Sequence, residues 1–291
     1  MPELPEVEVV RSGLARWVVG RRILDVRVLR DRAVRRHPAG QRDFRDRLLG
    51  ATPMSVQRRG KFLWLPLAGR DEALVAHLGM SGQLVLPPAG SPAEPHLRAS
   101  FELAGGLTLR FIDQRTFGWL AVEPMLTGRG GRDVPLSVAG IAPDPFEECF
   151  DPAATVTAIR GRRGPVKSAL LDQGLISGVG NIYADEALWR AGRHWATPGE
   201  RLSRRDALAL LDHVRAVMSD ALAEGGTSFD HLYVNVNGES GYFSRDLAVY
   251  GRDGQECLRC GSMIVREPYA NRSAFRCPRC QRRPRSRRPT R

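Results

Sequence analysis

The first residues of the chain could carry amine and carboxylate chemistry. The sequence begins Met-Pro-Glu, so removal of Met1 would leave Pro2 as a free secondary amine. An α-amino group titrates at about pH 7.7–8.0, so part of it is unprotonated near neutral pH. Such an amine can attack a carbonyl carbon and form an iminium, for which Glu3 is an adjacent proton carrier and Glu6 lies one turn on. The simpler interpretation is a capped helix start, because prolines and acidic residues both favour the first helical turn.

Four of the five cysteines could bind a metal ion. They occur as two pairs, Cys257-x2-Cys260 and Cys277-x2-Cys280, with 16 residues between the pairs. This spacing is typical of a zinc ribbon, in which four thiolates hold one structural Zn²⁺. Cys149 stands apart and has no neighbouring histidine, so we interpret it as an incidental thiol.

Three short motifs combine residue types that suit nucleic acid. RRGKFLW places Lys61 between two arginines and a strand, where it could transfer protons or contact a phosphate. HLGMSG puts Met80 on a tight turn, from which a long apolar side chain could wedge between bases. DQRTFG offers Arg115 and Phe117 on one face of a strand, a pair that suits an unstacked base. The motifs also have ordinary interpretations: a solvated basic turn, a core methionine and an exposed strand end.

Two further segments could contact phosphate. The glycine-rich QGLISGVGNIYADE leads into a helix, where backbone N–H groups beside Asn181 could bind an anion. Arg162, Arg163 and Lys167 add positive charge upstream. Arg272 lies between the cysteine pairs, in a hairpin that zinc would stiffen and that could insert into DNA. A packing corner between helices explains the glycine-rich segment equally well.

The sequence pattern changes along the chain from strands to helices. An amphipathic helix is predicted first, because apolar residues recur at helical spacing up to Gly20: Val7, Val10, Leu14, Trp17 and Val18. From about residue 22 to 122, short apolar runs between Gly and Pro clusters predict a mostly antiparallel β-sandwich or barrel. A Gly/Pro-rich linker follows. The pattern is helical after Asp151, with a long helix from Ser203, and residues 238–254 predict a loop.

The composition favours a nucleic-acid partner. Of 291 residues, 44 are basic and 32 acidic, which gives a net charge of +12. Six arginines follow Gln281 in a Pro-containing tail that we expect to be disordered, and without them the charge is still +6. No stretch resembles a membrane span or a signal peptide, so we expect a cytoplasmic protein, in which five cysteines argue against a disulfide framework.

In order along the chain, these motifs resemble the bacterial formamidopyrimidine-DNA glycosylase and endonuclease VIII family. The resemblance runs from PELPEVE through KFLW, HLGMSG, D-x-R-x-F-G and LLDQ…GVGNIYADE to GYF…VYGR and the zinc ribbon ending at Cys280. It covers nearly the whole chain except the basic tail. The PELPE start, HLGMSG and D-x-R-x-F-G resemble the formamidopyrimidine branch.

The resemblance implies an α+β multidomain fold: an N-terminal helix plus antiparallel β-sandwich, a helical helix-two-turn-helix domain and a C-terminal zinc ribbon. The expected boundaries are residues 1–132 for the catalytic helix and β-sandwich domain, 133–150 for the linker, 151–237 for the DNA-binding helix-two-turn-helix domain, 238–256 for a lesion-covering loop, 257–281 for the ribbon and 282–291 for the tail.

The resemblance also implies a monomeric base-excision repair enzyme, a DNA glycosylase and abasic-site lyase. Pro2 would attack C1′ of a flipped nucleotide, displace 8-oxoguanine or formamidopyrimidine and form the iminium. Glu3 would donate and accept the proton, with Glu6 in support. β- and δ-elimination would then cut the strand on both sides of the sugar. Lys61 would be the proton donor in β-elimination, and Arg272 would act in the δ step or hold a phosphate.

The implied partner is double-stranded DNA that contains oxidised bases or abasic sites, which would associate the protein with the nucleoid. Met80, Arg115 and Phe117 would fill the gap left by the extruded base, with Arg115 facing the orphaned cytosine. The phosphate contacts would be His96, Arg163, Lys167 and Asn181. One structural Zn²⁺ would be bound, without a redox or organic cofactor. The chain departs from the family pattern at Thr116, where relatives often have a second basic residue, and in EPHLRAS around His96.

Two other functions remain open from the sequence. An endonuclease VIII-like glycosylase would share the scaffold but remove oxidised pyrimidines. A non-enzymatic zinc-ribbon DNA-binding protein would keep the scaffold and lose Pro2, Glu3 or Lys61. All three of these residues are present in the sequence.

Overall fold

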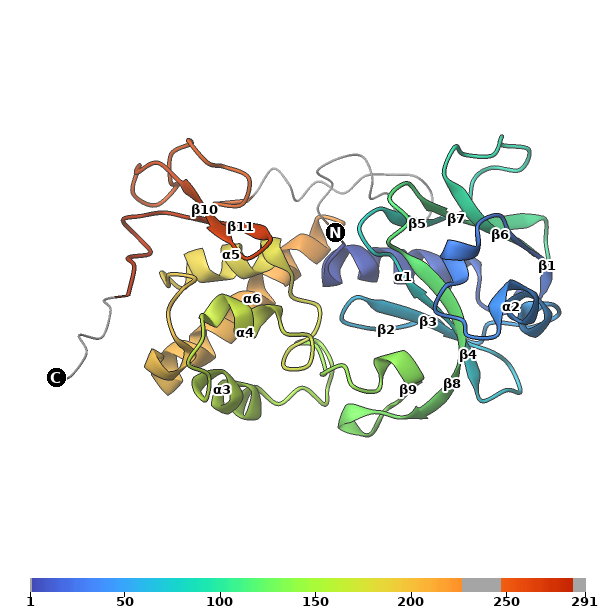
Figure 1. Cartoon of the computed structure of the whole chain (residues 1–291), viewed down its shortest axis with the longest axis horizontal. Coiled ribbons are helices and arrows are strands. Elements are labelled where there is room, and N and C mark those ends of the chain that lie inside the picture. Colours follow the sequence, from blue (N-terminus) through green and yellow to red (C-terminus); the bar gives the residue numbers. More distant parts are fainter. Residues whose placement is uncertain (1, 227–246, 285–291) are drawn as a thin grey trace. The chain divides into compact units, whose positions relative to one another are not determined.

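Two units make up the computed structural model, which describes residues 2–226 and 247–284 (Figure 1). The first unit comprises residues 2–143 and 221–226, and the second comprises residues 144–220 and 247–284. No helix in these described ranges is long and apolar enough to cross a membrane.

Helix α1 (Leu4–Trp17) opens the first unit, as the sequence predicts. Glu3 is its N-cap, and a proline occupies the first turn. Its apolar residues Val7, Val10 and Leu14 are buried in the core. Trp17, the last residue of the helix, departs from the predicted apolar face and is 39% exposed.

Two antiparallel sheets form most of the first unit. One has the strand order β1-β6-β7-β5, and the other has the order β2-β3-β4-β8-β9. One core lies between them, because residues of both sheets, such as Phe101 and Leu63, are buried in the same cluster with α1. The predicted N-terminal helix and antiparallel β-sandwich are thereby confirmed. The strands are β1 (Ile23–Val28), β2 (Gln57–Arg59), β3 (Phe62–Pro66), β4 (Glu72–His77), β5 (Gly82–Val85), β6 (Leu97–Leu103), β7 (Leu107–Asp113), β8 (Trp119–Thr127) and β9 (Asp133–Pro135).

A helical insertion follows β1, where the sequence pattern predicts only strands. It consists of the 3-10 turn η1 (Asp31–Val34) and helix α2 (Gly40–Leu48). Phe44 and Leu48, four residues apart on one face of α2, are fully buried in the sandwich core. This short helix lies among arginines and aspartates, and its two apolar positions are too few to stand out as a periodic pattern.

The predicted linker, residues 133–150, contains ordered elements. Strand β9 and the 3-10 turn η3 (Leu136–Val138) lie in it, and Val134 and Val138 pack against Trp64 on the outer face of the five-stranded sheet. A further 3-10 turn, η2 (Arg129–Gly131), precedes β9. The proposed domain boundaries stay predictions.

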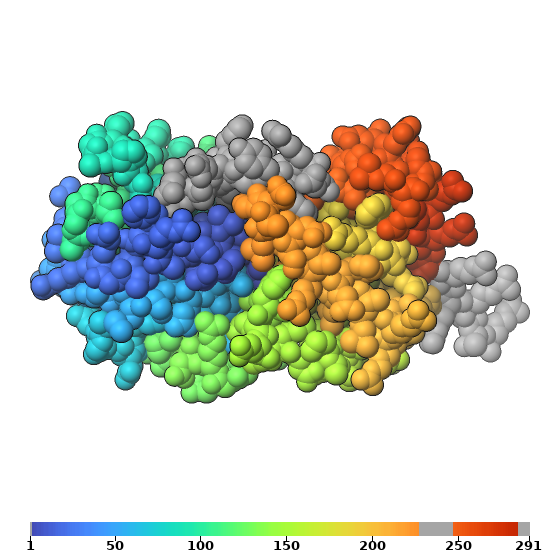
Figure 2. All heavy atoms as spheres, turned by 180° about the vertical axis from the view of Figure 1, so that it is seen from behind, coloured from blue at the N-terminus to red at the C-terminus, as the bar shows by residue number. Residues whose placement is uncertain are grey.

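Helices dominate the second unit. Helix α3 starts after Asp151, whose carboxylate accepts a hydrogen bond from Ala154 N at 3.0 Å. The long helix α6, orange in Figure 2, starts after Ser203, whose hydroxyl accepts from Asp206 N at 3.0 Å. Both starts agree with the sequence pattern. The helices are α3 (Pro152–Arg160), α4 (Val166–Leu171), α5 (Asn181–Arg190), the 3-10 turn η4 (Gly199–Arg201) and α6 (Arg204–Ala223).

The second unit ends in a two-stranded hairpin of β10 (Val265–Tyr269) and β11 (Arg272–Arg276). The hairpin lies between the two cysteine pairs, as expected for a zinc ribbon. Of the predicted lesion-covering loop, residues 238–246 lie outside the described residues. The same holds for residues 227–237 of the predicted helix-two-turn-helix domain and residues 285–291 of the tail.

Candidate active site and nucleic-acid interface

The N-terminus of α1 brings Pro2, Glu3 and Glu6 together. Pro2 is buried, and the two glutamates are 2% and 5% exposed. The backbone N–H of Glu3 donates to Glu6 Oε2 at 2.8 Å, one half of a reciprocal capping box. Gly226 lies against Glu6, because a Cβ on this glycine would be 3.4 Å from Glu6 Oε1. Two buried carboxyl groups therefore flank Pro2 at the positive end of the helix dipole.

Lys61 lies in the tight turn between β2 and β3, and only 8% of it is exposed. This hairpin is tied to α1, because Arg58 Nε donates to Glu8 Oε2 at 2.9 Å. Burial raises the pKa of Glu8, but hydrogen bonds from Arg11 and Arg58 outweigh that effect and hold the pKa below its usual value. A charged Glu8 thus joins the element that carries Pro2 to the one that carries Lys61.

His77, to which the sequence pattern assigns no role, lies beside the predicted site residue Lys61. It is the first residue of HLGMSG and pairs with Phe62, the neighbour of Lys61, across β3 and β4. Its ring stacks on Trp119, with centroids 5.9 Å apart. Burial, followed by the charge of Lys61, lowers the pKa of His77 to about 4, so the ring is neutral at pH 7. The signal in the sequence is its position: the histidine ends the strand that leads into the Met80 turn, three residues before Met80.

The loops that carry Met80 and the Arg115–Phe117 pair touch through their backbones. A Cβ on Gly79, next to Met80, would lie only 2.4 Å from Gly118 N and from Phe117 C. The Arg115 guanidinium lies 5.5 Å from the centre of the Phe117 ring, and Phe117 is 45% exposed. The predicted wedge residues therefore lie on two adjoining loops of the same unit.

A buried carboxylate, Asp113, holds these loops together. Its oxygens accept hydrogen bonds from Ser81 Oγ at 2.5 Å and from Gly118 N at 2.7 Å. Ser81 Oγ in turn accepts from Arg115 N at 2.8 Å. Asp113 N donates to the carbonyl of His96 at 3.0 Å, which places His96 beside the same loops. Ser81 and Asp113 lie within the motifs HLGMSG and DQRTFG, respectively, but the sequence alone indicates no role for either.

In the second unit, the position of Lys167 corrects the prediction that it contacts a DNA phosphate. Its side chain is fully buried, and its ammonium lies 2.7 Å from Asp185 Oδ1. Burial raises the pKa of Asp185 to about 7, against the lowering effect of Lys167. The ammonium also donates to the carbonyl of Ser273 at 3.2 Å. The sequence predicts a surface charge at this position because no local pattern indicates the buried partners, Asp185 and the Ser273 carbonyl.

The same backbone carbonyl positions Arg272. Asn181 Nδ2 donates to Ser273 O at 2.9 Å, so Lys167 and Asn181 converge on the residue after Arg272. Arg272 itself is exposed at the tip of the β10–β11 hairpin. Arg163 is also exposed, and within the described part of the chain it does not join this cluster.

Two adjacent acidic residues of α5 anchor the segment that leads into the ribbon. Asp185 Oδ2 accepts from Phe275 N at 2.9 Å, and Glu186 accepts from the backbone N–H groups of Ala248, Val249 and Tyr250, each at 2.9 Å. Burial raises the pKa of Glu186, whereas these three backbone donors lower it. Both carboxylates were quoted in the GVGNIYADE motif without a role.

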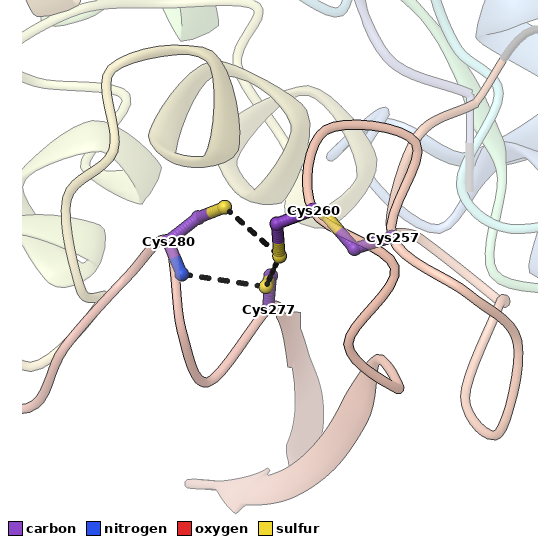
Figure 3. A group of neighbouring side chains, drawn as sticks. All are labelled: Cys257, Cys260, Cys277 and Cys280. Carbon is purple, nitrogen blue, oxygen red and sulfur yellow. Dashed lines mark hydrogen bonds between the residues drawn. The ribbon is translucent and has the colours of Figure 1, made fainter.

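The four paired cysteines converge on one point, with their sulfur atoms all within 4.8 Å of one another (Figure 3). Cys260 Sγ lies 3.4 Å from Cys277 Sγ and 3.5 Å from Cys280 Sγ. Four thiolates at about 2.3 Å from a central ion would be spaced similarly, so this donor set fits a tetrahedral metal ion. Trp189 Nε1 donates to Cys257 Sγ at 3.4 Å and links α5 to the cluster.

Comparison with known proteins gives two matching family models. They describe the formamidopyrimidine-DNA glycosylase N-terminal domain, over residues 1–120, and the formamidopyrimidine-DNA glycosylase H2TH domain, over residues 141–231. A relative from Salinispora arenicola with the name formamidopyrimidine-DNA glycosylase is 59% identical over 98% of this chain and 98% of its own length. The chain belongs to the formamidopyrimidine-DNA glycosylase family.

Solved structures of this glycosylase family have the same fold. A complex between the Lactococcus lactis protein and DNA that contains an abasic site is 30% identical, with a TM-score of 0.84 over 97% of this chain and 100% of that chain. A complex between a mutant of that protein and DNA that contains Fapy-dG is 31% identical, with a TM-score of 0.85 and the same coverage. The fold class predicted from the sequence is thus confirmed.

The cysteine cluster predicts a metal-dependent second unit. Cys260→Ser should release the bound metal ion and lower the unfolding temperature, because three thiolates cannot close a four-coordinate structural site. Metal content and thermal unfolding measure the two effects. Cys149→Ser is the matched control, since Cys149 is exposed and outside the cluster, and it should change stability by less than about 0.5 kcal/mol. Full metal retention by Cys260→Ser would contradict the assignment.

Proposed function

We propose that the chain is a bifunctional base-excision repair enzyme. It removes the oxidised purines 8-oxoguanine and formamidopyrimidine from duplex DNA and then cleaves the strand at the abasic site. The observation that carries the proposal is the buried cluster of Pro2, Glu3 and Glu6 at the start of α1, in a chain of this family. The abasic and Fapy-dG lesions in the Lactococcus lactis complexes support the substrate class.

The chemistry begins at the N-terminal amine after removal of Met1. The Pro2 nitrogen bonds to C1′ of the flipped nucleotide while the glycosidic bond breaks and the damaged base leaves. The C1′–O4′ bond then breaks and O4′ takes a proton, so that the ring-opened sugar is held as an iminium, which makes its neighbouring C–H acidic. Glu3 donates and accepts the proton, since it is adjacent to the amine. Glu6 fixes Glu3 by accepting its backbone N–H, and so keeps the carboxyl group in place.

Strand cleavage uses a second set of groups. Loss of the sugar proton drives β-elimination. In this step Lys61 acts as proton donor to the leaving group. A lysine suits this role because its compact ammonium can lose a proton, whereas an arginine stays charged. Arg272 acts in the δ-elimination or holds a phosphate from the tip of the β10–β11 hairpin. Lys167 supports this hairpin from inside the second unit instead of contacting DNA.

DNA contacts supply the energy for base flipping, which costs a few kcal/mol. Met80, Arg115 and Phe117 fill the space of the extruded base, and Arg115 faces the orphaned cytosine. His96, Arg163 and Asn181 contact phosphates. The excess of 12 positive charges favours this association. We expect the enzyme to act at the nucleoid, and to do so as a monomer.

The metal ion is Zn²⁺, held by Cys257, Cys260, Cys277 and Cys280. Four thiolates at this spacing are the ligand set of structural zinc, which has no open position for a substrate. Zinc therefore stiffens the hairpin that carries Arg272, and the reaction at the sugar uses only groups of the chain.

Substrate choice tests the proposal. Purified protein with a verified Pro2 terminus should cleave duplex DNA with 8-oxoguanine opposite cytosine at least about tenfold faster than DNA with thymine glycol, because a fitted pocket discriminates by hydrogen bonding. Single-turnover cleavage on denaturing gels measures both rates. Faster cleavage of thymine glycol would favour an endonuclease VIII-like enzyme, and DNA binding without cleavage of either would favour a non-enzymatic DNA-binding protein.

Substitution of Lys61 tests its role in strand cleavage. Lys61→Ala should slow nicking by about 10²-fold, the usual contribution of a positioned proton donor. Lys61→Arg is the matched variant, since it keeps the charge for DNA binding but not the proton transfer, and it should also nick slowly while binding DNA normally. Base release and nicking are measured separately on the same duplex. Unchanged rates of both steps in Lys61→Ala would reject the assigned role.

A further inference from the structure

A β-branched residue with a left-handed backbone lies between Arg115 and Phe117. Thr116 has φ of +55°, a conformation that residues of this type rarely adopt. Its carbonyl accepts from Arg32 Nε at 3.3 Å. The next two carbonyls, of Phe117 and Gly118, accept from the Arg35 guanidinium at 2.7 and 2.6 Å. The surrounding hydrogen bonds therefore impose the turn, and the sequence of the loop does not favour it by itself.

The strained turn is joined to the Met80 loop through buried groups. Ser81 and Asp113 are 2% and 1% exposed. The Ser81 hydroxyl donates to Asp113 and accepts from Arg115 N, and Asp113 also accepts from Gly118 N, so one carboxylate fixes both sides of the turn. The close approach of Gly79 to Gly118 puts the backbones of the two loops in direct contact. Met80, Arg115 and Phe117 consequently extend from one interlocked support.

We propose that Ser81 and Asp113 are positioning residues that hold Met80, Arg115 and Phe117 as a preformed wedge for base flipping. The inference rests on the function proposed above and deepens it. Loops that had to become ordered on binding DNA would spend binding energy on that ordering. A wedge that is already in place leaves this energy available for unstacking the damaged nucleotide. Neither residue needs to touch the reacting sugar.

This role has a signature that distinguishes it from general stabilisation. A wedge matters when a base must be displaced from a duplex. It matters little for an abasic site in single-stranded DNA, where no stacked base has to be displaced. Loss of the support should therefore slow excision from duplex DNA much more than elimination at a single-stranded abasic site. It should also weaken the preference for cytosine opposite the lesion, because Arg115 would be less well placed.

The experiment compares Ser81→Ala with Ser100→Ala, a matched control in which a buried serine of strand β6 in the same unit is changed. Single-turnover excision of 8-oxoguanine opposite cytosine and opposite adenine is measured, together with cleavage of a single-stranded abasic site. Ser81→Ala should lower the ratio of duplex to single-strand rates by roughly five- to tenfold, the effect of one lost buried hydrogen bond, and the control should leave it unchanged. A 2-aminopurine reporter next to the lesion should show slower flipping.

A second variant keeps the proposal testable if Ser81→Ala fails to fold. Thr116→Gly removes the backbone strain and leaves Ser81 and Asp113 intact, so it should fold at least as stably as the parent protein. It should lower the same rate ratio by less than Ser81→Ala does, because the hydrogen bonds to the turn remain while glycine gives its backbone more conformational freedom. Equal losses on both substrates, or an unchanged ratio in folded Ser81→Ala and Thr116→Gly, would overturn the positioning role. Absence of both activities in the parent protein would instead refute the proposed function, and the inference with it.

Discussion

The ion pair between Glu8 and Arg58 joins the two elements on which the proposed chemistry depends. Helix α1 carries Pro2, Glu3 and Glu6, and the β2–β3 hairpin carries Lys61. The pair is only 8% exposed on its arginine side, so solvent screens it weakly, and Arg11 binds the same carboxylate. Together with the core packing of α1 against β3, this pair fixes the proposed nucleophile and proton donor relative to each other.

Lysine and arginine occupy different kinds of position in this chain. Only two of the 44 basic residues are lysines, Lys61 and Lys167, and both are buried. Arginine serves for surface charge and for contacts such as those of Arg35 with backbone carbonyls, because it stays charged and presents several donors. At Lys167 a single point charge fits between Asp185 and a carbonyl, where a planar guanidinium would need more room. At Lys61 the proposed reaction needs a group that can lose a proton.

Much of the fold could be predicted from the sequence, because the helical period of α1, the alternation of short strands and the cysteine spacing are local signals. The order of the domains could also be predicted, because the family motifs occur in a fixed order along the chain. The short helix α2 and strand β9 were missed, since each buries only two side chains against partners far along the chain. In the candidate site, local motifs pointed to Arg115, Phe117 and Arg272, which are exposed in the structure and whose roles stay predictions. They could not distinguish the buried Lys167 from a surface charge, nor reveal His77, Ser81 and Asp113, whose roles arise from tertiary contacts.

Covalent trapping shows whether the N-terminal proline is the nucleophile. The protein would be incubated with duplex DNA that carries one 8-oxoguanine opposite cytosine, reduced with borohydride, digested and mapped by mass spectrometry. With Met1 removed, the chain has only three amines, at Pro2, Lys61 and Lys167, so the assignment is unambiguous. We expect an adduct on Pro2, which an N-terminal extension abolishes without loss of DNA binding. An adduct on Lys61, or cleavage without any adduct, would contradict it.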